Sequence, residues 1–174
     1  ADYYQNVIEP QIIEDNGKKI ALLSVSTDEP EVMSKIATNN FQGVLDYNDD
    51  RIYEIIKSTK KSVDYFIILP HWGKEFLHYP SVQLRKKAYK WIEAGADLII
   101  GHHPHVIQGK ENYQGKWIYY SLGNYIFPTF YKKNGIKVNW KDENNKSILL
   151  EIDFCNEIKI SEVGLKYNQK NNLL

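Results

Sequence analysis

The stretch DLIIGHHPHVIQG, residues 97–109, places three histidines directly after a short apolar run. The run over residues 96–101 is mostly apolar, which is typical of a strand that is covered on both faces of a parallel sheet. His102, His103 and His105 would then lie just past the carboxyl end of a buried strand, where open α/β folds bind their ligands. The stretch therefore predicts an α/β fold with a parallel sheet, and a site at the carboxyl end of one of its strands.

Two further apolar runs, at residues 18–26 and 64–70, predict central strands of the same sheet. Between them, apolar residues at helical spacing predict a helix behind a polar cluster that could cap it: Ile52, Ile55 and Ile56, after Asn48, Asp49 and Asp50. A second helix is expected over residues 81–94, with Ser81 as N-cap, Gly95 after its end and an apolar stripe of Leu84, Ala88, Trp91 and Ile92. The order predicts parallel βαβ units.

The pattern of apolar and polar residues changes in the late part of the chain. Residues 116–124 predict another strand that ends in a Gly-Asn turn, and residues 127–145 are loop-like. Alternation over 147–154, followed by 157–167, predicts an antiparallel hairpin at a sheet edge. We expect an α/β fold in one domain, residues 1–174, in which the polar residues 168–174 form a frayed tail.

Composition excludes several classes of function. Lys and Arg number 22, as do Asp and Glu, so no global charge excess indicates a nucleic-acid partner. The single cysteine, Cys155, excludes an internal disulfide framework and a cysteine-based zinc site. No stretch approaches the ~18 continuous apolar residues of a spanning helix. The chain begins with Ala, so we expect it to be a processed or excised piece.

The histidine cluster is the strongest candidate for chemistry, because a neutral imidazole is a good ligand for zinc and related ions. In an extended segment, His103 and His105 would point the same way and His102 the opposite way, with Pro104 stiffening the backbone between the pair. The alternative is a turn in which one or two of these histidines only form hydrogen bonds.

Four more residues are expected at the same edge of the sheet. His71 follows the strand at 64–70, and Glu75 could ligate a metal, orient a histidine or act as a general base. Asn124 could hydrogen-bond a substrate oxygen beside Ser121. The alternatives are a satisfied polar histidine, a solvated glutamate and a turn asparagine.

Three segments together, DYFIILPHWGKEF (64–76), AGADLIIGHHPHVIQG (94–109) and YYSLGNYIF (119–127), resemble the bacterial capsule-synthesis CapA family, which is associated with poly-γ-glutamate capsules. That family is similar to a branch of the calcineurin-like metallophosphatase superfamily. The resemblance implies an α/β/β/α sandwich with a two-metal site at strand ends. This chain would supply its C-terminal portion, with parallel βαβ units and the late antiparallel hairpin.

The resemblance also implies roles for individual residues. The superfamily's isolated histidine maps onto His71, and its Gly-His-x-His element maps onto residues 101–105 with one residue extra. His71, His103 and His105 would then bind a divalent metal ion (Zn, Mn or Fe), with His102 as the alternate ligand. His102 or Glu75 would move protons, while Ser121 and Asn124 would bind substrate.

The superfamily's early motifs, an Asp-x-His, a Gly-Asp and an Asn-His pair, have no counterpart in this sequence. Three histidines and one glutamate cannot bridge and balance two dications. The resemblance therefore implies either an upstream segment of the same protein that completes the site, or a degenerate site with one metal or none.

The resemblance implies capsule polyglutamate synthesis, export or attachment at the outer face of a bacterial membrane, with an anchor outside this chain and a membrane synthase as a possible partner. The activity would be metal-dependent hydrolysis of a phosphoesterase-like kind, completed by the upstream segment. The alternative is a non-catalytic assembly factor that binds the acidic polymer or the synthase. An unrelated cytosolic α/β hydrolase module is a third possibility.

Overall fold

A six-stranded sheet in the order β1-β2-β3-β4-β6-β5 organises the computed structural model, which describes residues 3–27, 35–126, 130–131, 135, 137–138 and 141–168. Most of the expected tail, residues 169–174, and much of the expected loop at 127–145 lie outside this range. The elements are α1 (Tyr3–Ile8), β1 (Gln11–Asp15), β2 (Lys18–Val25), α2 (Arg51–Thr59), β3 (Tyr65–Pro70), α3 (Val82–Ala94), β4 (Leu98–Ile100), β5 (Lys110–Tyr113), β6 (Lys116–Tyr119), β7 (Phe130–Tyr131), β8 (Lys137–Val138), the 3-10 helix η1 (Asp142–Asn145), β9 (Lys146–Phe154) and β10 (Ile158–Lys166).

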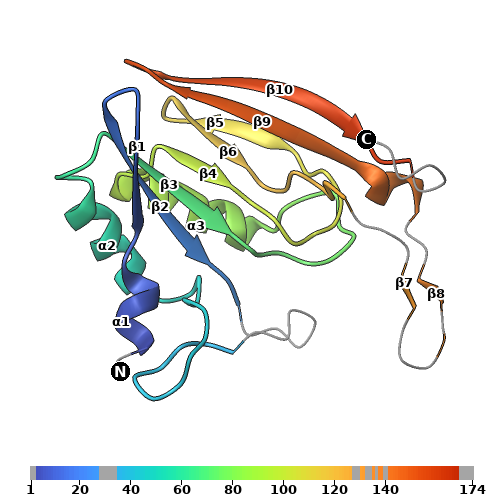
Figure 1. The fold of residues 1–174 in the computed structure, drawn as a ribbon, viewed down its shortest axis with the longest axis horizontal. Coiled ribbons are helices and arrows are strands. Elements are labelled where there is room, and N and C mark those ends of the chain that lie inside the picture. The colour runs from blue at the N-terminus through green and yellow to red at the C-terminus, as the bar shows by residue number, and fades with distance from the viewer. Residues whose placement is uncertain are drawn as a thin grey trace.

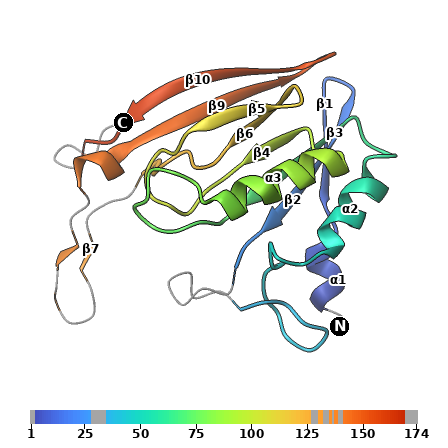
Figure 2. The ribbon, with the colours of Figure 1, turned by 180° about the vertical axis from the view of Figure 1, so that it is seen from behind.

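The parallel core of the sheet confirms the predicted βαβ units. β2 pairs with β3, β3 with β4 and β4 with β6, all in parallel. The crossover helices α2 and α3 lie side by side on one face of the sheet (Figures 1 and 2). All four parallel strands therefore point their carboxyl ends toward one edge, which is the edge predicted to hold the histidines.

Alternate residues of the central strands bury opposite faces of the sheet. One set packs against the two helices: Ala21, Leu23, Phe66, Ile68 and Ile99 contact a cluster that includes Ile52, Ile56, Leu84, Ala88, Trp91 and Ile92. The other set packs against the late hairpin: Ile20, Ile67, Leu98 and Ile100 contact a cluster that includes Leu150, Ile152, Phe154 and Ile160. The described chain thus forms three layers, helices, sheet and hairpin, of the expected sandwich.

The predicted helix signals are confirmed in α3 and differ in detail in α2. Ser81 Oγ accepts a hydrogen bond from the backbone N–H of Leu84 at 3.2 Å, and Gly95 ends the helix with φ 123°. At α2, Asp50 makes no capping bond through its side chain, whereas Asp49 Oδ1 accepts from the N–H of Arg51 at 2.9 Å. α3, with 13 residues, is the longest described helix, and none of the described helices has both the length and the hydropathy of a membrane-spanning segment.

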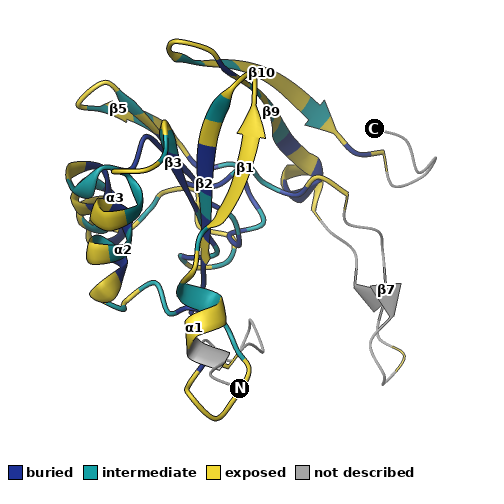
Figure 3. Cartoon of the chain, turned by 60° about the vertical axis from the view of Figure 1, so that its left-hand side comes forward, coloured by how far each residue is buried: buried dark blue, intermediate teal, exposed yellow. Residues whose placement is uncertain are grey.

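Two edge strands, β1 and β5, were not predicted from the sequence. β1 forms an antiparallel hairpin with β2 around Asn16 and Gly17, and every residue of β1 is exposed (Figure 3). β5 pairs with β6 around Gln114 and Gly115, which both have positive φ angles. An Asn-Gly pair is a strong hairpin signal, because both central positions of that turn need φ above zero.

The predicted late hairpin exists as β9 and β10, but its expected place at a sheet edge is wrong. β9 and β10 form a separate two-stranded sheet that covers the face opposite the helices (Figure 1). An isolated bridge between Gly123 and Ser147 links it to the chain after β6. Ile152 and Phe154 gain more by covering that apolar face than by extending the edge, since burial removes their surface from water.

Candidate metal centre

The ends of β3 and β4 bring the first two histidines together. His71 and His102 form an isolated parallel bridge, in which the N–H of His102 donates to the carbonyl of Pro70 at 2.9 Å. The N–H of Trp72 donates in turn to the carbonyl of His102 at 3.1 Å. The predicted shared edge of these two histidines is therefore confirmed.

Gly101 lets the loop after β4 pass close to its neighbours. A Cβ on Gly101 would lie 2.1 Å from the carbonyl oxygen of Tyr120 and 2.5 Å from Nε1 of Trp72. The indole of Trp72, fully buried, donates to that same carbonyl at 3.0 Å. Only glycine fits there, and this steric limit explains why the predicted Gly-His-x-His element begins with a glycine.

Two loops, one after β3 and one after β4, are held against each other. The backbone N–H of Phe76 donates to the carbonyl of Pro104 at 2.8 Å, and the ring of Phe76 stacks on His105 with 6.1 Å between centroids. Asn144 of η1 donates from Nδ2 to the carbonyl of His105 at 2.9 Å. These contacts place Glu75 beside the histidines, and no sequence signal had pointed to Asn144.

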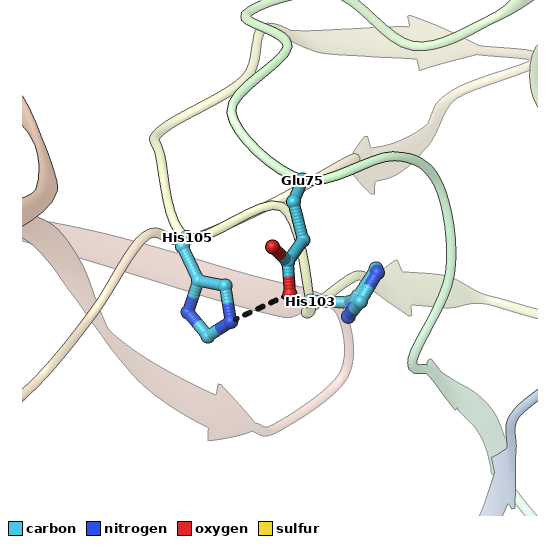
Figure 4. Close-up of side chains that lie close together, drawn as sticks. All are labelled: Glu75, His103 and His105. Atoms are coloured by element: carbon cyan, nitrogen blue, oxygen red, sulfur yellow. Dashed lines mark ion pairs between the residues drawn. The ribbon is translucent and has the colours of Figure 1, made fainter. Parts of the chain in front are cut away.

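Glu75, His103 and His105 form a group that could hold a metal ion. One ligand atom from each of the three lies within 4.8 Å of the other two. Figure 4 shows the Glu75 carboxylate between the two rings, with Oε1 3.8 Å from Nε2 of His105. His103 is buried, while Glu75 and His105 are half-buried. The predicted His103 and His105 pair is thus brought together, and Glu75 joins it.

The backbone of this pair differs from the expected extended segment. His103 has φ 103° and His105 has φ 58°, so both lie in the left-handed region that non-glycine residues rarely adopt. Strand alternation therefore cannot explain why the two side chains meet. The turn itself, and its contacts with Phe76 and Asn144, bring them together.

Asn124 lies at the edge of the sheet that holds the histidines, and its side chain orients His105. Oδ1 of Asn124 lies 2.7 Å from Nδ1 of His105. Because an amide oxygen only accepts, Nδ1 of His105 is the donor, and the lone pair on Nε2, which faces Glu75, could bind a metal. Nδ2 of Asn124 is buried and has no hydrogen-bond partner among the described residues.

His71 lies against His103, outside the group of three. Nε2 of His71 is 3.0 Å from Nδ1 of His103. Burial, together with the neighbouring histidines, lowers the pKa of His71 to about 4. His71 is therefore neutral at neutral pH and shares one hydrogen with His103. Its role as a direct ligand stays a prediction.

His102 and Ser121, the other two predicted site residues, lie outside the group of Glu75, His103 and His105. His102 and His71 line a cavity of about 550 Å³ beside β2, and burial lowers the pKa of His102. Ser121 is buried, and its Oγ donates to the carbonyl of Val106 at 2.8 Å, which holds the loop after β4. The catalytic role of His102 and the substrate role of Ser121 stay predictions.

Comparison with known proteins identifies the family. The family model described as "Bacterial capsule synthesis protein PGA_cap" matches residues 4–129. This chain belongs to the PGA_cap family. The match includes Glu75, His103, His105 and Asn124, while Asn144 lies beyond it.

Two curated relatives of this PGA_cap chain are similar over part of their length. The PGA biosynthesis protein CapA of Bacillus subtilis (strain 168) is 39% identical over 114 residues, which cover 64% of this chain and 29% of the relative. The capsule biosynthesis protein CapA of Bacillus anthracis is 32% identical over 155 residues, which cover 86% of this chain and 35% of the relative. The PGA_cap chain thus spans about a third of each relative's length.

A solved structure supports the fold of this PGA_cap chain. A hypothetical protein from Thermus thermophilus superposes with a TM-score of 0.50 at 11% identity, covering 90% of this chain and 61% of the other. At that identity the likeness concerns the fold alone.

Proposed function

We propose that this chain acts in capsule synthesis through a metal-dependent site that cleaves or transfers a bond of an anionic surface polymer. The observation that carries the proposal is the convergence of Glu75, His103 and His105 from two strand-end loops. Membership of the PGA_cap family supports the link to capsule.

The donor set fits one divalent ion. Two imidazoles and one carboxylate are ligands that zinc, manganese and iron accept. Among the described residues no other group of three potential ligands has this spacing, so these residues offer a ligand set for one ion. Glu75, His103 and His105 would hold the ion, with His71 as a further predicted ligand. When bound, such an ion supplies Lewis-acid activation of a substrate oxygen or of water.

The chain's own residues would position substrate and ligands around that ion. Asn124 accepts a hydrogen bond from His105 through Oδ1 and offers its unpartnered Nδ2–H to a substrate oxygen. His71 stays neutral beside His103, so it adds no positive charge that would repel a bound cation. His102 would move protons, a role that Glu75 would take only in place of binding the ion, and Ser121 would bind substrate beside Asn124.

The polymer and the location are inferred from capsule-related relatives, whereas the partners are part of the proposal alone. The Bacillus subtilis relative is described as a PGA biosynthesis protein, which supports poly-γ-glutamate or a related cell-surface polymer as substrate. We place the protein at the outer face of the bacterial membrane, with a membrane synthase and an upstream segment of the same protein as partners.

A non-catalytic assembly role is the second candidate, and the presence of a single ligand group among the described residues favours it over a two-metal enzyme. Capsule formation in cells that carry His103→Ala/His105→Ala separates the two. The metal-dependent role predicts loss of capsule at normal protein level, with Gly109→Ala as a neutral control. Normal capsule in the double variant would refute metal-dependent chemistry and leave the assembly role.

A further inference from the structure

A second hollow lies beside the metal-ligand group and is formed partly by the same two loops. Its volume is about 280 Å³. Gly73 and Lys74, directly before Glu75, line one side, and Gln108 of the loop after β4 lines another. The start of α3 closes it through Ser81 and neighbouring residues. The hollow therefore adjoins the proposed centre through the chain itself.

The lining of this hollow favours an anion. Lys74 and Lys87 both line it, and the described residues give neither of them an ion pair of 4 Å or less. Burial lowers the pKa of Lys87, while the charges of Asp50 and Asp46 favour its protonated form. The first backbone N–H groups of α3, a helix of 13 residues, add the positive end of the helix dipole.

Gln108 has an acceptor oxygen that no described residue supplies with a hydrogen-bond donor. Its side chain is only 6% exposed, and Nε2 donates to the carbonyl of Leu77 at 2.8 Å. That bond fixes the orientation of the amide and leaves Oε1 as an acceptor, which is buried and has no partner among the described residues. Because an unmade hydrogen bond of a buried group is costly, a ligand N–H that reaches Oε1 would gain affinity.

The remaining walls suit an aliphatic linker. Leu77, Tyr79, Pro80 and Leu84 supply apolar surface to the hollow. Leu77 and Tyr79 are exposed by 51% and 82%, so a bound chain would cover apolar surface that now faces solvent. Methylene groups between an amide and a carboxylate could lie against these side chains.

We propose that this hollow binds an acidic residue of a polyamide chain, with its carboxylate at Lys74, Lys87 and the start of α3 and its amide N–H at Oε1 of Gln108. The hollow would hold the polymer while a neighbouring bond lies at the group of Glu75, His103 and His105. That link to cleavage rests on the proposed function, whereas the binding itself needs no metal.

Calorimetric titration of the full chain, kept metal-free with a chelator, tests the binding. The main probe is an N-acetylated γ-linked tetraglutamate, compared with N-acetylglutamate and with glutarate, which has no N–H. Lys74→Gln/Lys87→Gln is expected to weaken tetraglutamate binding at least about tenfold, because charged hydrogen bonds are lost. Lys61→Gln/Lys86→Gln removes the same charge outside the hollow and is expected to change binding less than about twofold.

Gln108→Met tests the amide contact separately, since it keeps the volume of the side chain and removes the acceptor. It is expected to weaken tetraglutamate binding about fivefold and to leave glutarate binding unchanged. Unaltered tetraglutamate binding in Lys74→Gln/Lys87→Gln, or equal weakening in the control pair, would overturn the proposal. Equal affinity for N-acetylglutamate and tetraglutamate would overturn the polymer as the source of the acidic amide.

The outcome is separable from that of the proposed function. Metal content of Lys74→Gln/Lys87→Gln is expected to equal that of the unmodified protein, and the unmodified protein is expected to bind tetraglutamate with similar affinity with and without metal. Loss of tetraglutamate binding in the metal-free unmodified protein would contradict a hollow that acts without metal.

Discussion

Oδ1 of Asn124 lies 2.7 Å from Nδ1 of His105, although the two residues are 19 positions apart. This contact makes Nδ1 the donor and Nε2 the ring nitrogen of His105 that faces Glu75. We therefore predict that Asn124→Ala lowers metal affinity by about 10–100-fold, as the loss of an outer hydrogen bond to a ligating histidine does elsewhere. Competition with a chromogenic chelator measures the change.

Asn124→Asp is the matched control, because it keeps an acceptor oxygen at the same place. We expect its metal affinity to stay within a few-fold of the unmodified protein. If Asn124→Ala binds metal as tightly as the unmodified protein, Asn124 does not orient His105 toward a metal.

Gly101→Ala should destabilise the fold, because the new Cβ would meet the carbonyl of Tyr120 at 2.1 Å and Nε1 of Trp72 at 2.5 Å. We expect a loss of about 3 kcal/mol in the free energy of unfolding, at the upper end for overpacking a core. Urea denaturation measures the loss. Gly109→Ala, whose Cβ would meet nothing within 4 Å, should change stability by less than about 0.5 kcal/mol. Equal stability of the two variants would disprove the steric role of Gly101.

Glu111 makes stability depend on pH. Burial alone raises the pKa of Glu111, but hydrogen bonds from Arg85, Tyr120 and Tyr89, with the charge of Arg85, hold it below the ordinary glutamate value. A lowered carboxylate pKa stabilises the fold above the unfolded pKa of about 4.5, and this contribution is lost as pH falls through the folded value.

The stability difference between the unmodified protein and Glu111→Gln should therefore be constant from pH 7 to about pH 5.5 and shrink below about pH 4.5. Urea denaturation at several pH values measures it. Glu54→Gln, in an exposed pair with Lys57, should show a smaller difference at neutral pH. A Glu111→Gln difference that grows on acidification would contradict the network's role.

Local sequence signals were enough to predict the sheet and the edge that holds the site. Apolar runs marked β2, β3 and β4, and parallel strands must end at a common edge, so His71 and the later histidines were expected at the same edge. The bridge between His71 and His102 agrees with that expectation. The hairpin of β1 and β2 also had a local signal, the Asn16–Gly17 pair, whereas Gln114–Gly115 is a weaker one.

The geometry of the site could not be predicted as well from the sequence, because it depends on contacts between segments that are far apart in the chain. Positive φ angles at His103 and His105 are not a property of histidine, so an extended segment was the reasonable expectation. The bond from Phe76 to Pro104 and the bond from Asn144 to His105 join segments that are 28 and 39 residues apart. Neither leaves a pattern along the chain.

Metal content is the most direct test of the central claim, that Glu75, His103 and His105 hold an ion. Elemental analysis of the full-length protein, purified without added chelator, is expected to find about one divalent ion per chain, as one His₂Glu group allows. His103→Ala/His105→Ala is expected to lose the ion while keeping its circular dichroism spectrum. A metal-free unmodified protein with normal capsule function, or unchanged metal content in the double variant, would contradict the account.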